Sequence, residues 1–141
     1  MNNDIPDGAD PKFDHIGIAV ENIETFTEIY ENLGLVRGNH ETIVNQDVEI
    51  QFFQTGDTHI ELIAPISEKS PVAKFLKKNG PGLHHIAFNV NNINSALDHY
   101  ITKGFIAIDK EPRMGAGGCL IAFLHPKSTG GVLIELRQNN R

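Results

Sequence analysis

An internal repeat constrains the fold of this chain more than any other feature. When the 141-residue sequence is shifted by 70 positions, the segment DHIGIAV at 14–20 falls on HHIAFNV at 84–90. Over positions 15–34, seven of the twenty pairs are identical, where average composition would give about one. Ile60-Glu61-Leu62 also recurs as Ile134-Glu135-Leu136, at a shift of 74. The repeat predicts two copies of one structural module.

Each copy begins with the pattern of a strand followed by a helix. In 15–20 and 85–90, large apolar residues alternate with smaller or polar ones, which is typical of a strand with one face on an apolar core. The helix that follows is expected to begin after Asn22 and to end at Gly34, and its copy lies between Asn92 and Gly104. Within the first helix, Ile23, Phe26, Tyr30 and Leu33 form one apolar stripe.

Further strands complete each module as β-α-β-β-β. Four are predicted with good alternation, over 48–53, 58–63, 120–124 and 131–136, and two weaker ones over 35–42 and 105–109. Ser70-Pro71 is expected to begin a short linking helix that runs to about Lys78. The expected fold is α+β: a flexible tail (1–11), then a single domain (12–139) with one module over about 12–79 and the other over about 82–139.

Composition excludes several classes of function. Eighteen Asp and Glu against twelve Lys and Arg give a net charge of -6, whereas binding to nucleic acid or to an anionic membrane surface requires a basic footprint. No apolar run approaches the ~20 residues of a membrane span, and the first residues lack the pattern of a signal peptide. The single cysteine, Cys119, cannot form an internal disulfide. These features predict a cytoplasmic protein.

Strand alternation assigns four polar side chains to the faces that point away from the core. His15 and His85 begin equivalent strands, and Glu61 and Glu135 lie between apolar residues in equivalent later strands. If the two modules pair their sheets into a cup, these four side chains converge. Two imidazoles and two carboxylates suit a divalent Zn, Mn, Fe or Co ion that keeps open positions for water or substrate.

The repeat also separates these histidines from the others. His84 aligns with Asp14 rather than with His15, and alternation places it on the core side of its strand. The remaining histidines have no counterpart in the other copy and are not assigned to the site: His40, His59, His99 and His125.

Several longer motifs make the resemblance to a known family specific. They are DHIGIAV at 14–20, SPVAKF at 70–75, GLHHIA at 82–87, EPR at 111–113 followed by GAGG at 115–118, and HPKSTGGVLIEL at 125–136. With them, the sequence resembles the vicinal oxygen chelate (glyoxalase-like) superfamily and, within it, the methylmalonyl-CoA epimerases. The first motif indicates only the superfamily, whereas the last is much more particular to the epimerases. The resemblance covers roughly 12–138.

The resemblance implies a reaction, a cofactor and a set of site residues. It implies interconversion of the two C2 epimers of methylmalonyl-CoA, an acyl-CoA substrate, by metal-assisted proton transfer, in a homodimer. The metal implied is Co²⁺, with Mn²⁺, Zn²⁺ or Ni²⁺ as alternatives, held by His15, Glu61, His85 and Glu135. The acid/base pair carries over onto Glu49 and Glu135. The residues expected to contact substrate are Gln51, Arg113, Lys127 and Ser128.

Other functions share this fold, and the sequence leaves them open. A glyoxalase I would use the same metal cup on a glutathione hemithioacetal. An extradiol dioxygenase would use two His and one Glu on iron, and the second glutamate argues against it. A non-enzymatic antibiotic-sequestering protein can lack a metal, but this function would not explain why the same His and Glu residues recur in both copies.

Overall fold

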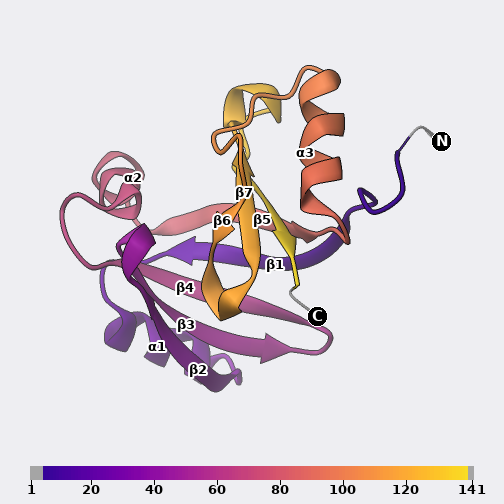
Figure 1. The fold of residues 1–141 in the computed structure, drawn as a ribbon. Helices are drawn as coiled ribbons and strands as arrows, with labels where there is room; N and C mark the ends of the chain where they lie inside the picture. Colours follow the sequence, from indigo (N-terminus) through magenta and orange to yellow (C-terminus); the bar gives the residue numbers. More distant parts are fainter. Residues whose placement is uncertain (1–4, 140–141) are drawn as a thin grey trace. The chain divides into compact units, whose positions relative to one another are not determined.

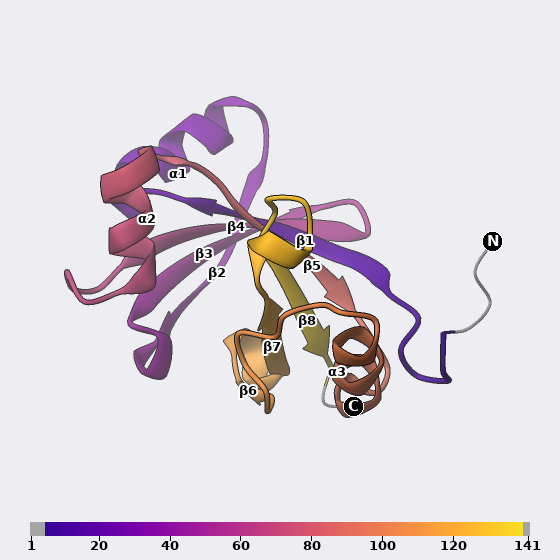
Figure 2. The same ribbon diagram turned by 90° about the horizontal axis from the view of Figure 1, so that it is seen from above.

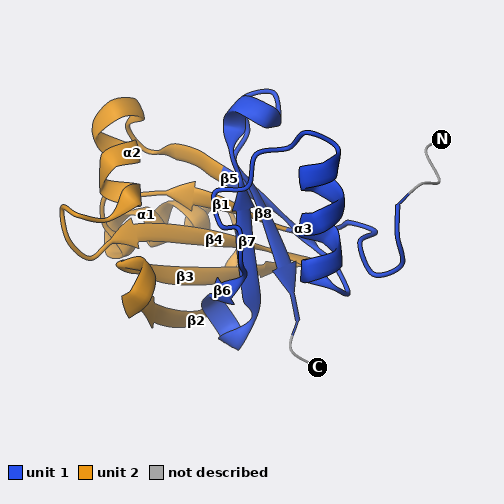
Figure 3. Ribbon diagram, turned by 45° about the horizontal axis from the view of Figure 1, so that its top comes forward, with its two compact units in different colours: residues 1–14, 85–141 blue, residues 15–84 orange. Residues whose placement is uncertain are grey.

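The computed structural model describes residues 5–139 and divides into two compact units. One unit, here called the N-terminal unit, comprises His15–His84; the other, the C-terminal unit, comprises Met1–Asp14 with His85–Arg141 (Figure 3). The division falls inside the first strand of each module rather than in the glycine-rich link at 80–82 that the sequence suggests. Within the described residues, no helix has the length and apolar character that a membrane span requires.

The N-terminal unit is a mixed four-stranded sheet with the predicted β-α-β-β-β order (Figure 1). Its strands lie in the order β2-β3-β4-β1, with β1 parallel to β4 and the other pairs antiparallel. The elements are β1 (Lys12–Ala19), α1 (Ile23–Asn32), β2 (Val36–Ile43), the 3₁₀ turn η1 (Val44–Gln46), β3 (Val48–Thr55), β4 (Thr58–Pro65) and α2 (Pro71–Asn79).

The helices begin and end where the sequence predicts. The side chain of Asn22 accepts a hydrogen bond of 2.9 Å from the backbone N–H of Thr25, which satisfies one of the free donors at the start of α1. Gly34 follows α1 with a φ of +100°, in the left-handed region that a side chain disfavours. At α2, the Ser70 hydroxyl accepts from the N–H of Val72, and Pro71 occupies the first turn, where its missing N–H costs nothing.

The core of the N-terminal unit lies between α1 and one face of the sheet. It is built from Val20, Ile23, Phe53, Leu62 and Ala64, with Ile18, Phe26, Tyr30, Leu35 and Ile60 packed against it. The predicted stripe of α1 is thus confirmed except at its end, because Leu33 follows the last helical turn and its side chain is 72% exposed.

The C-terminal unit repeats this plan. Its strands lie in the order β5-β8-β7-β6, with β5 parallel to β8 and the other pairs antiparallel. Helix α3 lies alongside β7 and β8 (Figures 1 and 2) and packs on them through Ile93, Ala96 and Leu97. The elements are β5 (Gly82–Asn89), α3 (Ile93–Thr102), β6 (Arg113–Met114), η2 (Ala116–Gly118), β7 (Leu120–Leu124), η3 (Pro126–Ser128) and β8 (Ile134–Gln138).

The weak strand predicted over 105–109 does not form a ladder. Only Ala107 makes an isolated bridge, to Leu124, and the second strand of this module is the short β6 instead. Side chains supply bonds along this segment: the Ser128 hydroxyl accepts from the N–H of Ile106, and Asp109 accepts from the N–H of Phe123. The prediction is therefore confirmed only in part: the backbone pairs with β7 through Ile108 N–H to Phe123 O and His125 N–H to Ile106 O, and side chains take over the remaining bonds.

Part of the predicted tail belongs to the C-terminal unit. Residues 1–4 lie outside the described residues, but Ala9 is fully buried in the core cluster of this unit, and Ile5 packs against that cluster. The carbonyl of Gly8 accepts a 2.7 Å hydrogen bond from the N–H of Asn92, directly before α3. The expectation of a flexible segment through residue 11 is therefore wrong for the part that the structure describes. The polar composition of this segment gave no sign that Ala9 is buried and that the Gly8 carbonyl is hydrogen-bonded.

Candidate functional site

In the N-terminal unit, strand pairing brings His15 and Glu61 together, as alternation predicts. Because β1 is parallel to β4 with His15 opposite His59 and Gly17 opposite Glu61, all four residues share the face away from α1. His15 Nε2 lies 3.0 Å from Glu61 Oε2, and the two side chains are 0% and 4% exposed. A carboxylate this deeply buried requires hydrogen bonds or a cation to offset its desolvation.

His59 completes this arrangement, although it had no counterpart in the repeat. Its Nε2 lies 2.9 Å from the same Glu61 Oε2, and its ring stacks on that of His15 with centroids 4.6 Å apart and an interplanar angle of 25°. The ring of Phe52 packs against the His59 ring, with centroids 5.7 Å apart. One side chain therefore constrains both members of the His15–Glu61 pair.

The C-terminal unit holds the equivalent pair. Glu135 lies opposite Ala87 in the parallel pairing of β8 with β5, so His85, two residues earlier, shares its face. His85 Nε2 lies 3.4 Å from Glu135 Oε1, and both side chains are under a tenth exposed. The ring of Phe123, which lies opposite Glu135 on β7, meets the His85 ring edge-on at 5.9 Å.

The neighbouring His84 lies on the other side of its strand. Its ring makes an edge-on contact at 4.9 Å with Phe75 of α2, within the N-terminal unit. Burial disfavours the charged imidazolium and lowers the pKa of His84 to about 4. The choice of His85 over His84 from the repeat is therefore consistent with their surroundings, because His84 packs against a helix.

The structure does not place Glu49 on the face that carries His15 and Glu61. In the β3–β4 pairing, Phe52 lies opposite Glu61 and Glu49 lies opposite Ala64. Residues directly opposite in an antiparallel pair point to the same face, and Ala64 belongs to the core under α1. On this face, His40 Nε2 lies 3.6 Å from Glu49 Oε2, and both side chains are more than a third exposed. Glu49, which the resemblance makes an acid/base residue, therefore lies on the opposite side of the sheet from His15 and Glu61.

Two predicted substrate contacts are instead occupied by local hydrogen bonds. Gln51 shares the face of Glu49, and its amide nitrogen lies within 3.1 Å of the carbonyl oxygens of Gly38, Asn39 and Phe52, at the irregularity in β2. The hydroxyl of Ser128 donates to the carbonyl of His125 at 2.8 Å and accepts from the N–H of Ile106. Both side chains stabilise the backbone around them.

The other two residues predicted to contact substrate, Arg113 and Lys127, have side chains that are less tied to local backbone bonds. Arg113 lies opposite Ile121 in the β6–β7 pairing, which puts it on the same face as Phe123 and Glu135. Its guanidinium lies 5.8 Å from the Phe123 ring centroid, and its Nε lies 3.1 Å from Asp109 Oδ1. Lys127 is exposed in η3, where its N–H donates to His125 Nδ1.

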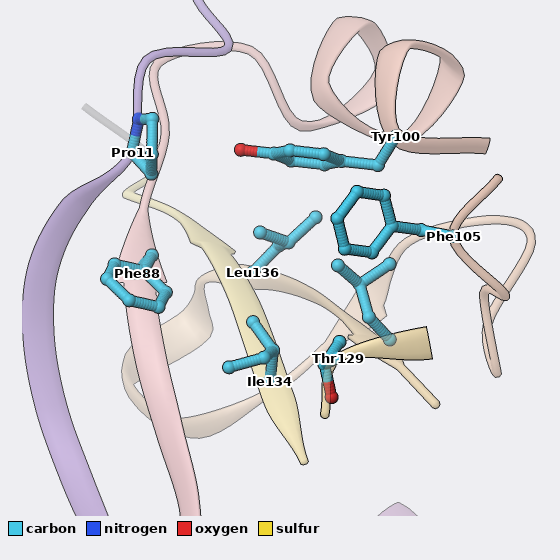
Figure 4. A pocket seen from close by; sticks show the side chains of 8 residues that line it. Pro11, Phe88, Tyr100, Phe105, Thr129, Ile134 and Leu136 are labelled. Carbon is cyan, nitrogen blue, oxygen red and sulfur yellow. The ribbon is translucent and has the colours of Figure 1, made fainter. Parts of the chain in front are cut away.

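A cavity of about 260 Å³ in the C-terminal unit does not belong to this site. It lies between α3 and the sheet, and its lining includes Phe88, Tyr100, Phe105, Ile134 and Leu136 (Figure 4). Ile134 and Leu136 flank Glu135 in β8 and so point to the opposite face. The cavity is a space in the apolar core region, and the His85–Glu135 pair lies on the other side of the sheet.

The chemistry of the two pairs fits a divalent cation. Each unit offers one imidazole nitrogen and one carboxylate oxygen, 3.0 Å and 3.4 Å apart, with both carboxylates almost fully buried. Nitrogen and oxygen donors of this kind bind Zn, Mn, Fe and Co ions, and two carboxylates neutralise a dication.

The family model of the glyoxalase/bleomycin resistance protein/dioxygenase superfamily matches residues 14–123. The chain belongs to this superfamily. It is 47% identical over 126 residues to an uncharacterized protein of Bacillus subtilis, with 89% of this chain and 90% of that protein covered. It is 38% identical over 129 residues to the mitochondrial methylmalonyl-CoA epimerase of Homo sapiens, with 90% of this chain and 73% of that protein covered.

A solved structure agrees with these relatives. The chain is similar to a variant of the Streptomyces coelicolor methylmalonyl-CoA epimerase in complex with 2-nitronate-propionyl-CoA, with a TM-score of 0.86 and 35% sequence identity. The similarity covers 92% of this chain and 94% of that one. The superfamily and the glyoxalase-like fold expected from the sequence are confirmed.

Sequence reasoning missed two polar residues on the face of the N-terminal unit that carries His15 and Glu61. His59 precedes Glu61 by two positions in the same strand, a spacing that alone places both on one face. Glu41 lies on that face too, but only through the pairing of β2 with β3, for which the sequence carried no signal.

Proposed function

We propose that this protein is a methylmalonyl-CoA epimerase, which interconverts the (2R) and (2S) forms of its substrate by removing and returning the proton at C2. The observation that carries the proposal is the pair of equivalent, buried His–Glu contacts, one in each repeat. Support comes from relatives and a solved structure that bear this name. The substrate class follows from the acyl-CoA derivative named in that structure.

We further infer that His15, Glu61, His85 and Glu135 together hold one divalent ion, for which the family resemblance favours Co²⁺. The equivalence of the two pairs in the repeat supports this. If only one pair bound the ion, the buried carboxylate of the other pair would have no cation to offset its desolvation. When bound, the ion supplies Lewis-acid stabilisation of the negative charge that develops on the thioester oxygen. His59 holds the Glu61 carboxylate in place through its 2.9 Å contact.

Glu135 is the proposed acid/base group of the C-terminal unit. Its carboxylate takes the C2 proton, so that the C–H bond breaks, an O–H bond forms and the electron pair moves into the enolate of the thioester. Return of a proton to the opposite face of C2 inverts the centre, and this requires a second acid/base group. We do not assign this role to Glu49, because it lies opposite Ala64 on the side of the sheet that carries α1.

Arg113 and Lys127 are proposed to contact the substrate. Arg113 lies on the same face as Glu135 and carries a charge suited to the malonyl carboxylate or a CoA phosphate. Lys127 is exposed in a turn that follows β7, where it can meet phosphate as a point charge. The family resemblance further supports a cytoplasmic homodimer.

The decisive experiment follows deuterium at C2. Purified protein loaded with Co²⁺ is mixed with (2S)-methylmalonyl-CoA in deuterated water, and deuterium content and configuration are read by NMR and mass spectrometry. Metal-dependent deuterium uptake with loss of stereochemistry is expected. Absence of uptake by metal-loaded protein would overturn the proposal in favour of glyoxalase-like chemistry on another substrate, and absence of metal binding would favour a sequestering protein.

A further inference from the structure

The proposed epimerisation requires a second acid/base residue besides Glu135. A two-base inversion needs one group on each side of C2, and Glu135 belongs to the C-terminal unit. The second group is therefore sought among titratable side chains on the sheet face of the N-terminal unit that carries His15 and Glu61.

Strand register determines which side chains share that face. Glu61 lies opposite Phe52, and two residues along the same strands Ile63 lies opposite Ile50. In the next pairing, Ile50 lies opposite Glu41. Glu41, Ile50 and Ile63 therefore form one cross-strand row on the face of Glu61.

Among the strand residues that the structure describes in this unit, this face holds four titratable side chains. They are His15, His59, Glu41 and Glu61. His15 and Glu61 are the proposed ligands, and His59 stacks on one of them and contacts the other. Glu41 is thus the carboxylate on this face that the proposed metal site does not use.

The surroundings of Glu41 suit a proton-transfer group. It is partly exposed, and the side chains next to it on this face are apolar: Ile50 on β3, Ile63 on β4 and Ile43 on its own strand are 4%, 5% and 7% exposed. Strands β2 and β4 are two spacings apart, about 10 Å. Glu41 and Glu61 therefore lie on the same sheet face across a short apolar floor, a distance comparable to the length of a small acyl group.

We propose that Glu41 is the second acid/base residue of the reaction, an inference that rests on the proposed epimerase function. For one epimer, the Glu41 carboxylate accepts the C2 proton and Glu135 donates a proton to the opposite face of the enolate. For the other epimer the two groups exchange roles. No oxidant or further reactant is needed, since one C–H bond breaks and one forms in each turnover.

The test compares Glu41→Gln with Glu49→Gln, the rival carboxylate on β3, and with Glu28→Gln, a control at an exposed position of α1. Each Co²⁺-loaded variant is given pure (2R) or (2S) substrate in deuterated water, and epimerisation and C2 exchange are measured separately. Glu41→Gln is expected to epimerise at least about 100-fold more slowly, as for loss of an acid/base group, with a larger defect than Glu49→Gln, and Glu28→Gln is expected to keep the native rate. In Glu41→Gln, Glu135 still removes the proton of one epimer, so that epimer exchanges with retention while the other does not.

Three results would overturn the assignment: native epimerisation in Glu41→Gln, loss of exchange from both epimers together with loss of Co²⁺ binding, or a larger defect in Glu49→Gln. Glu41→Asp guards against misfolding, because it keeps the charge and withdraws the carboxylate by one methylene; it should slow the same single exchange. If native Co²⁺-loaded protein catalyses neither exchange nor epimerisation, the proposed function itself fails. Native activity with an unaffected Glu41→Gln variant refutes only the role of Glu41.

Discussion

Replacement of His59 by Phe tests whether this side chain prepares the metal site. The change keeps an aromatic ring against His15, where the rings stack at 4.6 Å, and removes the Nε2 group that lies 2.9 Å from Glu61. A hydrogen bond to a buried charged group is worth about 1.5–3 kcal/mol, and groups that orient metal ligands typically contribute about 10- to 100-fold in affinity. The dissociation constant for Co²⁺ is therefore expected to rise about 10- to 100-fold.

Isothermal titration of chelator-stripped protein with CoCl₂ measures this change without any assay of activity. His59→Gln serves as the matched variant, because its amide N–H reaches a similar position and can still donate to Glu61, while the stacked ring is lost. It is expected to recover most of the affinity. The visible absorption of bound Co²⁺ should keep the same band pattern in both variants, since the proposed set of ligands does not include His59.

Unchanged or tighter Co²⁺ binding in His59→Phe would refute the reasoning. A failure of His59→Gln to recover affinity, together with a changed absorption spectrum, would show that His59 coordinates the metal directly. Native protein that binds no Co²⁺ at all would instead remove the metal site on which the argument depends.

Three further predictions concern other parts of the chain. The pKa of His84 is about 4 in the folded protein and about 6.5 when unfolded, so the unfolded chain binds the proton more readily and stability falls as the pH is lowered through that window. Between pH 7 and pH 5, native protein with EDTA should lose about 2 kcal/mol more than His84→Phe, and parallel urea curves for the two proteins would contradict this. Glu135→Gln should slow epimerisation by at least about 100-fold, as followed by NMR, and a native rate would exclude Glu135 as an acid/base group. Asn22→Ala removes the cap of α1 and should cost about 1 kcal/mol in urea unfolding, whereas Asn22→Asp, which can still cap, should not.

The sequence predicted the local elements well where each signal was local. Asn22 and Gly34 bound α1 because a capping side chain and a left-handed glycine act within one turn of the helix. The duplicated His and Glu residues were found for a related reason: Ile60 and Leu62 on either side of Glu61, and Ile18 in the strand of His15, belong to the core under α1, so alternation assigns His15 and Glu61 to the opposite face.

Alternation failed in β3 because this strand is buried on both faces. Val48 and Ile50 are buried on the side of Glu61, and Phe53 is buried on the side of α1. Apolar residues at both parities leave the sequence with no way to tell which face Glu49 shares.

The sequence by itself determined the repeat, the order of the elements, the two His–Glu pairs and the choice of His85 over His84. Only the tertiary structure showed that Glu41, and not Glu49, shares the sheet face of His15 and Glu61 in the N-terminal unit. That decision depends on the register of β2 on β3 and of β3 on β4, which joins Glu41 to Ile50 and Ile63 across three strands. A shift of one residue moves every side chain of a strand to the opposite face, and such a register is set by pairing between strands rather than within any one of them.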